Sequence, residues 1–97
     1  METKIKMFTA EWCAPCKLMK PLVNKLIEVG YPIEMHDVDT DSETASKYNI
    51  RSVPTMLVTQ NDNVVESIVG AQELGDLVPR LNLYVEEKNL PEDFYEG

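Results

Sequence analysis

The hydrophobic pattern of the chain alternates between a period of two residues and a period of 3.6 residues, and these changes predict its elements. Residues 4–10 are expected to form a strand, because Ile5 and Met7 alternate with lysines before Phe8. Residues 17–29 are expected to form a helix with one apolar face. The apolar positions on that face are Met19, Leu22, Val23, Leu26 and Ile27.

Glycine and capping residues mark the ends of the next elements. Gly30 is expected to cap the first helix at its C-terminus. Residues 33–39 form the second expected strand, which must run parallel to the first if the helix between them is a right-handed crossover. Residues 40–43 have the pattern of a capping box with Thr40 as the N-cap, and this predicts a short helix that ends near Tyr48.

The last third of the chain predicts a hairpin followed by a helix. Two β-branched, apolar runs at 55–59 and 64–69 are typical of paired strands, here joined by a four-residue loop. The last helix carries Leu74, Leu77, Val78, Leu81 and Val85 on one face. We expect it to start near Asp76, because Pro79 then lies in the first turn, where its missing N–H costs nothing. A start near Glu73 would place Pro79 in the helix interior.

The expected order is therefore β-α-β-α-β-β-α, an α/β fold with a four-stranded mixed sheet flanked by three helices. Residues 1–88 are expected to form this domain, since a chain of 97 residues supplies one core and not two. Residues 89–97 are expected to form an acidic, frayed C-terminal tail, although Phe94 and Tyr95 could dock on the body.

Composition and charge exclude several classes of function. The formal net charge of -8 argues against binding to nucleic acid, which requires a basic face. No signal peptide or apolar run of transmembrane length is visible, so we expect a cytoplasmic monomer with no membrane partner. Hydrophobic residues make up 43% of the chain, which is enough for a packed core without structural disulfides or a structural metal.

The two cysteines, Cys13 and Cys16, lie where the first strand meets the first helix. In a reducing compartment such a pair is catalytic or metal-binding rather than structural. The start of a helix favours a thiolate, so Cys13 is expected to be the attacking sulfur and Cys16, one turn further on, the resolving thiol. A zinc site would need about four ligands, whereas the chain offers this pair and His36. We expect no metal and no cofactor.

Two segments of the chain resemble the thioredoxin family. Residues 10–17, followed by Pro21, resemble the active-site segment, and residues 47–55 resemble the segment that ends in a cis-proline beside it. Together with Gly70, these similarities extend over most of residues 5–77. The resemblance implies a thioredoxin-like fold in a minimal version, without the strand and helix that precede the active-site strand in larger members.

The resemblance also implies an activity, namely a thiol-disulfide oxidoreductase that reduces protein disulfides as Cys13 and Cys16 cycle between dithiol and disulfide. Its partners would be disulfide-containing proteins and a thioredoxin reductase-like electron source. The implied substrate-binding residues are Trp12, Ala14, Pro15, Val53, Pro54 and Gly70. A cis bond at Pro54 would present the backbone of Val53 to an extended substrate segment.

The sequence departs from the family at one pair of positions. Thioredoxins usually carry a buried aspartate six residues before the attacking cysteine, near a lysine on the neighbouring strand, but here these positions hold Met7 and Met35. We therefore expect slower resolution of the mixed disulfide, and a more stable core, than in a thioredoxin that has the acid.

Three other functions remain open from the sequence. A glutaredoxin would use glutathione, but residues 71–73 lack the Thr/Ser-Asp pair that holds the glutathione carboxylate in those proteins. A dedicated electron donor to ribonucleotide reductase would be a special case of the main prediction. A non-catalytic binding subunit would use the surface formed by Trp12, Pro54 and Gly70.

Overall fold

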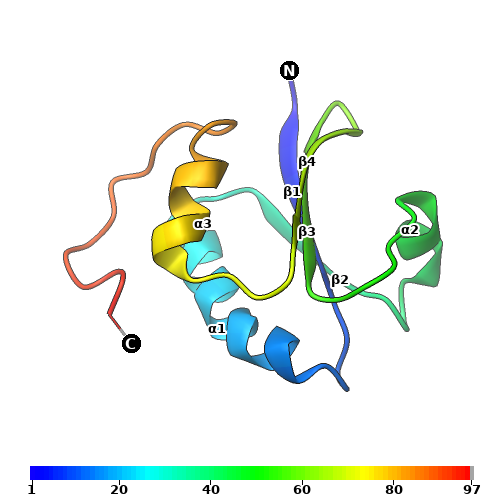
Figure 1. Cartoon of the computed structure of the whole chain (residues 1–97). Coiled ribbons are helices and arrows are strands. Elements are labelled where there is room, and N and C mark those ends of the chain that lie inside the picture. Colours follow the sequence, from blue (N-terminus) through cyan, green and yellow to red (C-terminus); the bar gives the residue numbers. More distant parts are fainter. Residues whose placement is uncertain (97) are drawn as a thin grey trace.

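The computed structural model describes residues 1–96 and places a mixed four-stranded sheet between helices (Figure 1). The elements are β1 (Thr3–Thr9), α1 (Ala14–Glu28), β2 (Ile33–Asp37), α2 (Ser42–Lys47), β3 (Thr55–Gln60), β4 (Asn63–Val69) and α3 (Leu74–Leu81). The order is the one predicted, and the bounds of β1 and β2 differ from prediction by one or two residues. In Figure 1, α1 and α3 lie on one face of the sheet and α2 lies on the other.

The sheet has the strand order β2-β1-β3-β4. β1 runs parallel to β2 and antiparallel to β3, and β3 and β4 form an antiparallel hairpin. β1 is therefore a central strand, and Ile5, Met7 and Phe8 are fully buried. Because α1 follows this central strand, the loop between them lies at the carboxyl end of β1, in the middle of the sheet and away from its outer strands.

The two faces of the sheet bury cores of different size. The larger core lies against α1 and α3 and contains Ile5, Met7, Met19, Val23, Leu26, Tyr31, Met56, Val58, Ile68, Leu74, Leu77, Val78, Leu81 and Phe94. The smaller core, under α2, consists of Phe8, Ala45 and Leu57. Within residues 1–96, no helix is both long enough and apolar enough to cross a membrane.

α1 begins three residues earlier than predicted, because Cys13 itself caps it. Cys13 has an extended backbone and accepts a hydrogen bond from the N–H of Cys16, as an N-cap residue does. At the other end Gly30 has a φ of 108°, and its N–H donates to the carbonyl of Ile27. The predicted glycine cap is therefore confirmed.

α2 does not begin with the predicted capping box. Its N-cap is Asp41 and not Thr40, and no side chain caps its N-terminus. The carboxylate of Asp41 instead lies 2.7 Å from Nδ1 of His36 and accepts a hydrogen bond from the hydroxyl of Thr44. The prediction was wrong because a side chain on β2 takes up the carboxylate in place of the helix N–H groups.

The hairpin between β3 and β4 is tighter than predicted. Gln60 pairs with Asn63, which leaves a loop of two residues and not four. Asn61 and Asp62 have φ values of 52° and 70°, the backbone conformation of a type I′ turn. This turn matches the twist of the paired strands, so strand pairing continues up to it.

α3 begins at Leu74, so the predicted start near Asp76 was wrong. Its N-cap is Glu73, and Pro79 lies in the helix interior, where the helix lacks one hydrogen bond. Leu74 is 6% exposed and extends the buried stripe of the helix by one turn. Burial of this side chain therefore outweighs the cost of an internal proline.

The C-terminal segment docks on α1. Phe94 is 2% exposed and belongs to the larger core, so the docking that the sequence left open for Phe94 occurs and the tail is not frayed at this position. Lys25 of α1 donates to the backbone carbonyl of Phe94 and, at 3.2 Å, to that of Glu96. The ammonium of Lys25 also lies 5.1 Å from the centre of the Phe94 ring. Gly97, the last residue of the predicted tail, lies outside the described residues.

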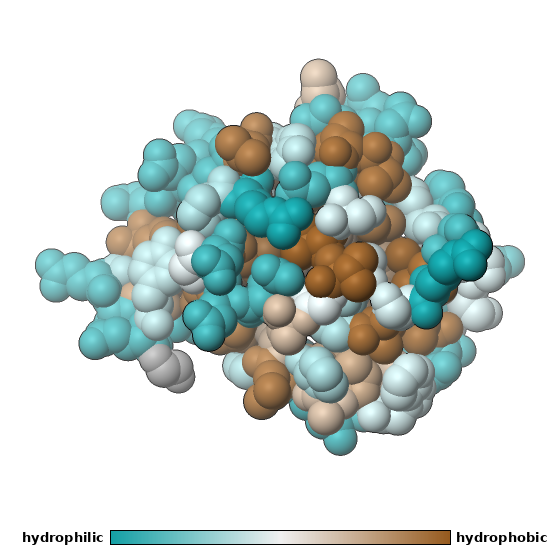
Figure 2. Space-filling model, in the orientation of Figure 1, coloured by the Kyte–Doolittle hydropathy of each residue, from teal (hydrophilic) through white to brown (hydrophobic). Residues whose placement is uncertain are grey.

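β4 forms an exposed edge of the sheet. Val64, Val65 and Val69 remain 46%, 40% and 60% exposed on this strand. Figure 2 shows apolar side chains in the middle of the face across which β4 runs in Figure 1, with hydrophilic residues around them. Val69 is the last residue of β4, so part of the exposed apolar surface adjoins Gly70.

Candidate active site

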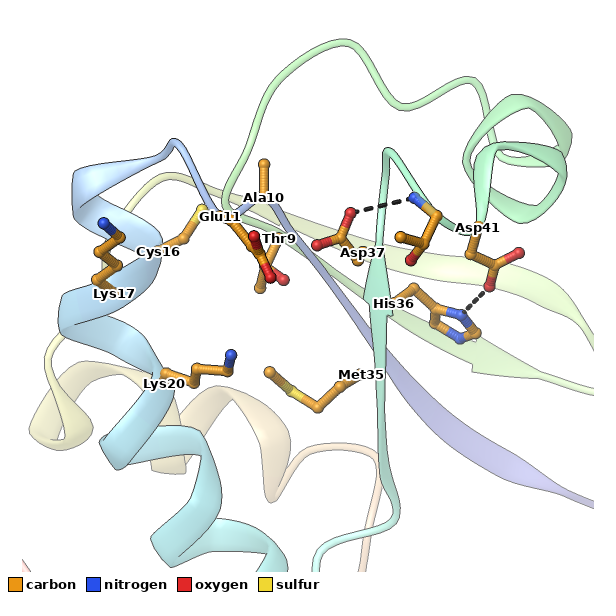
Figure 3. Close-up of a pocket in the computed structure, with 11 residues that line it drawn as sticks. Thr9, Ala10, Glu11, Cys16, Lys17, Lys20, Met35, His36, Asp37 and Asp41 are labelled. Atoms are coloured by element: carbon orange, nitrogen blue, oxygen red, sulfur yellow. Dashed lines mark hydrogen bonds and ion pairs between the residues drawn. The ribbon is translucent and has the colours of Figure 1, made fainter.

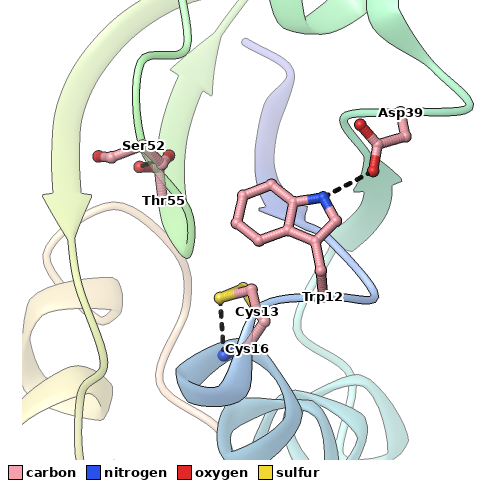
Figure 4. The surroundings of a disulfide bond; sticks show 6 residues. All are labelled: Trp12, Cys13, Cys16, Asp39, Ser52 and Thr55. Carbon is pink, nitrogen blue, oxygen red and sulfur yellow. Dashed lines mark hydrogen bonds between the residues drawn. A yellow bond between two sulfur atoms is a disulfide. The ribbon is translucent and has the colours of Figure 1, made fainter.

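The two cysteines form a disulfide at the N-terminus of α1 (Figure 4). Their Cα atoms are 5.2 Å apart, and the N–H of Cys16 donates to Sγ of Cys13 at 3.2 Å. The positive end of the helix dipole also points at this sulfur. When the disulfide is reduced, both effects stabilise negative charge on Cys13, which is the form that attacks disulfides.

Both cysteines are shielded from solvent by apolar neighbours. Cys13 is 5% exposed and Cys16 is 2% exposed, in a small cluster with Ala10. Val38 and Val53 pack against this cluster. Val38, which follows β2, and Val53, which precedes Pro54, therefore help to cover the two sulfurs.

Trp12 is the exposed aromatic residue beside the disulfide. Its side chain is not packed into the core, since the residue is 70% exposed, but its indole N–H donates to the carboxylate of Asp39 at 2.9 Å (Figure 4). Asp39 follows β2, which is parallel to β1, so both strands deliver their following loops to the same sheet edge. Sequence reasoning missed Asp39; the signal was an acid at the carboxyl end of a strand predicted to be parallel.

The segment around Pro54 lies on the other side of the disulfide. The Val53–Pro54 peptide bond is cis, as the family resemblance implied. The N–H of Gly70 donates to the carbonyl of Pro54 at 2.9 Å, which joins the end of β4 to this segment. Gly70 has a φ of 92°, a left-handed conformation that favours glycine. The structure thus places Val53 against the cysteines and Gly70 against Pro54.

Three further residues complete the description of this edge. Ala14 and Pro15 are exposed residues in the first turn of α1. Val69, which sequence reasoning did not single out, is 60% exposed and pairs in register with Thr55, the residue after Pro54. Exposed apolar residues therefore lie in the first turn of α1, at Ala14 and Pro15, and beside the Pro54 segment, at Val69.

A hollow of about 580 Å³ lies on the inner side of Cys16, between α1 and β2 (Figure 3). Met35 lines it, and Met35 pairs in register with Met7, which is fully buried. The two positions at which the family usually carries a buried acid and a lysine are thus occupied by neighbouring apolar side chains. Any ionisable group near Cys16 must come from another part of this hollow.

His36, the one histidine of the chain, also lines this hollow and is held there in a polar cluster. Its ring lies between the carboxylates of Asp41, at 2.7 Å, and Glu34, at 3.3 Å, and stacks on Phe8 with ring centres 5.2 Å apart. The hydrogen bond from His36, with a second from Thr44, holds the pKa of Asp41 below its ordinary value. Within residues 1–96, no three His, Cys, Asp or Glu side chains are grouped to hold a metal ion.

A cysteine pair that caps a helix after a central strand, opposite a cis-proline, defines the thiol-disulfide oxidoreductases of the thioredoxin-like fold. Comparison with known proteins agrees with this class. The thioredoxin family model matches residues 2–83. The chain belongs to the thioredoxin family, and it is a protein-disulfide reductase with a redox-active Cys13–Cys16 pair.

Individual relatives are similar over most of the chain. The thioredoxin of Mycobacterium tuberculosis is 35% identical over 85 residues, which cover 77% of this chain and 73% of that protein. The thioredoxin of Bacillus subtilis is 44% identical over 66 residues, covering 65% of this chain and 64% of that protein. Among solved structures, a mutant thioredoxin from Halobacterium salinarum NRC-1 aligns with a TM-score of 0.78 at 31% identity, over 92% of this chain and 78% of that one.

Proposed function

We propose that Cys13 attacks the disulfide of a protein substrate and that Cys16 resolves the mixed disulfide. In the first step the Cys13 thiolate bonds to one substrate sulfur, and the other substrate sulfur leaves as a thiolate. In the second step the Cys16 thiolate attacks Cys13 and releases the first substrate sulfur. Two electrons pass from the protein dithiol to the substrate, which gains two protons. The hydrogen bond from the Cys16 N–H to Cys13 Sγ, at the helix N-terminus, carries this assignment.

The surface around the pair is proposed to bind an extended segment of the substrate. Its residues are Trp12, Ala14, Pro15, Val53, Pro54 and Gly70. Within the described chain, the N–H and C=O of Val53 have no backbone partner, so they are free to pair with a substrate strand. Trp12 offers an exposed aromatic face whose position Asp39 holds, and aromatic residues of this kind dominate the energetics of many interfaces.

The electron source is proposed to be a thioredoxin reductase-like enzyme. A Mycobacterium leprae protein named bifunctional thioredoxin reductase/thioredoxin is 35% identical to this chain over 85 residues, which form 19% of that protein. We further propose that the protein acts as a cytoplasmic monomer. Residues 1–88 would form the catalytic domain, and the acidic segment 89–97 would stabilise it through Phe94.

Trapping the mixed disulfide tests the assignment of the two cysteines. Cys16→Ser should react with a disulfide-containing protein and stop at a covalent complex through Cys13, because the resolving thiol is missing. Cys13→Ser should form no such complex and should have no reductase activity. A stable complex through Cys16 in the Cys13→Ser protein would reverse the assignment, and biological function retained by the double serine variant would indicate a non-catalytic binding role.

A second assay identifies the electron source. The oxidised protein is incubated with NADPH and a thioredoxin reductase, or with glutathione, and its free thiols are counted by alkylation. We expect the reductase to restore both thiols and glutathione to be slow. Rapid reduction by glutathione alone would favour the glutaredoxin-like alternative.

A further inference from the structure

The resolving step requires a proton acceptor for Cys16. A thiol attacks a disulfide as its thiolate, and Cys16 is 2% exposed, so bulk water has little direct access to its proton. The strands beneath it offer no ionisable group at Met7 or Met35. The hollow on the inner side of Cys16 is the route that the structure leaves open for this proton.

Several charged or titratable side chains face this hollow. Lys17 and Lys20 belong to α1 and Glu11 precedes it; Asp37 and His36 belong to β2, and Asp41 follows it. The ring of His36 and the carboxylate of Asp41 bind each other at 2.7 Å, so both are engaged on the side of α2. Lys17 and Lys20 are cations at neutral pH and favour a nearby thiolate, but a cation does not accept a proton.

Asp37 is the carboxylate that the fold fixes in this hollow. One of its oxygens accepts hydrogen bonds from the N–H groups of Asp39, at 2.8 Å, and Thr40, at 3.2 Å. The other oxygen points back into the hollow, toward Thr9 and the side of Cys16 (Figure 3). Thr9 and Asp37 pair in register, so the position of this carboxylate is set by the sheet.

We propose that Asp37 accepts the proton of Cys16, through water held in the hollow, when the mixed disulfide is resolved. The hollow of about 580 Å³ has ample room for such water, since one water molecule occupies about 30 Å³ in the liquid. The inference rests on the proposed roles of Cys13 and Cys16. Glu11 is exposed in the turn between β1 and α1, so it serves as the control.

The step balances as follows. The proton leaves Sγ of Cys16 and reaches the Asp37 carboxylate, and the resulting thiolate forms a bond to Sγ of Cys13. The bond between Cys13 and the substrate sulfur breaks, and the substrate leaves as a thiolate. That thiolate then takes up the proton from Asp37 or from solvent, which regenerates the carboxylate. The protein dithiol is oxidised and the substrate disulfide is reduced.

The test separates the resolving step from the first attack. Asp37→Asn keeps an oxygen that can accept the two backbone hydrogen bonds but cannot accept a proton, and Glu11→Gln is the matched control. Formation and decay of the mixed disulfide with a chromophoric disulfide-containing peptide are followed by rapid acid quench from acidic to mildly alkaline pH. Thermal unfolding of both variants is recorded, and Asp37→Ser is the second variant should Asp37→Asn not fold.

We expect mixed-disulfide formation to be unchanged in Asp37→Asn and its decay to slow about 100-fold, at the low end of the usual range for general acid–base catalysis. The inflection that protonation of a carboxylate gives to the pH profile for decay should also disappear, leaving a rate that rises with pH only as the Cys16 thiolate forms, which a purely structural role of Asp37 would not cause. Glu11→Gln should behave as the native protein does. Unchanged decay and an unchanged pH profile in Asp37→Asn, or equal slowing in Glu11→Gln, would overturn the proposal. Failure to form any mixed disulfide at Cys13 would instead contradict the proposed function.

Discussion

At the scale of single residues, Cys13 combines two roles that are usually separate. It is the N-cap of α1, and it is the sulfur on which the helix N-terminus concentrates positive potential. The hydrogen bond that satisfies the N–H of Cys16 is thus the same one that stabilises a thiolate. Chemistry and helix capping depend on one atom.

Two substitutions separate these roles. In the reduced protein, Cys13→Ser should abolish reductase activity but keep most of the stability, because serine is a good N-cap residue. Cys13→Ala should abolish activity and also lower the free energy of unfolding by about 1 kcal/mol. Chemical denaturation of both variants against the reduced native protein measures the difference. Equal stability of the two variants would show that the cap contributes nothing.

Met7 tests the replacement of the usual buried acid. Met7→Asp places a carboxylate at a fully buried position whose cross-strand neighbour is Met35, so no cation compensates for it. We expect a lower denaturant midpoint together with faster resolution of the mixed disulfide. Denaturation and single-turnover reduction are measured on the same preparation. Loss of stability without any gain in rate would refute the kinetic half of this prediction.

At the scale of elements, β1 and β2 are joined by ion pairs as well as by backbone hydrogen bonds. Glu34 lies 2.7 Å from Nζ of Lys6 and 3.0 Å from Nζ of Lys4, while His36 contributes a third contact. The hydrogen bonds from Lys6 and then Lys4 lower the pKa of Glu34 to about 2. These contacts join the edge strand β2 to the central strand β1.

The stability of the protein should therefore depend on pH through Glu34. Because its pKa is lowered on folding, its contribution is fully present above about pH 4.5 and is lost as the pH falls through about 2. Glu34 is 38% exposed in its side chain, so solvent screens the ion pairs and Glu34→Gln should cost only about 1 kcal/mol at neutral pH. Urea denaturation at neutral pH and at about pH 2 measures this. A difference that persists unchanged in acid would contradict the assignment.

The side chain of Phe94 anchors the C-terminal segment in the larger core. Phe94→Ala should lower the free energy of unfolding by about 3–5 kcal/mol, as for other large-to-small core substitutions. Tyr95→Ala is the matched control, since Tyr95 is 53% exposed and should cost little. Thermal unfolding of the two variants measures both effects. A similar, small cost for both would mean that the segment is not held in solution.

At the scale of the whole molecule, the protein carries a negative net charge, while the proposed substrate-binding residues around its cysteine pair are uncharged. The net charge of -8 gives the protein a field that attracts basic partners and repels acidic ones. The site itself is lined by Trp12, Val53 and Val69, none of them charged. The apolar surface would thus supply contact with any extended segment, and the overall field would discriminate among the proteins that carry it.

A negative overall field around an uncharged site predicts that the reduction rate of charged substrates depends on ionic strength. The kcat/KM for a basic disulfide-containing peptide should fall as salt increases, and that for an acidic peptide of matched sequence should rise, because salt screens the long-range field. Steady-state reduction at several ionic strengths measures both values. Parallel curves for the two peptides would indicate that the charge serves solubility alone.

The sequence by itself determined the order of the elements, the position of the cysteine pair and the glycine cap of α1. These features depend on local patterns: hydrophobic period, the spacing of two thiols, and a glycine able to adopt positive φ. The cis-proline also followed from sequence, although through resemblance to a family and not through local physics, since most prolines are trans.

Only the tertiary structure decided which local preferences were overridden and which distant residues meet. α3 starts at Leu74 because the core buries that side chain, and α2 has no side-chain cap because the carboxylate of Asp41 binds His36. Asp39 reaches Trp12 and Asp37 faces the hollow beside Cys16 because β1 and β2 are parallel and end at one edge. These last contacts join residues that a whole helix separates along the chain, and the predicted parallel strands indicate a shared end of the sheet without showing which side chains meet there.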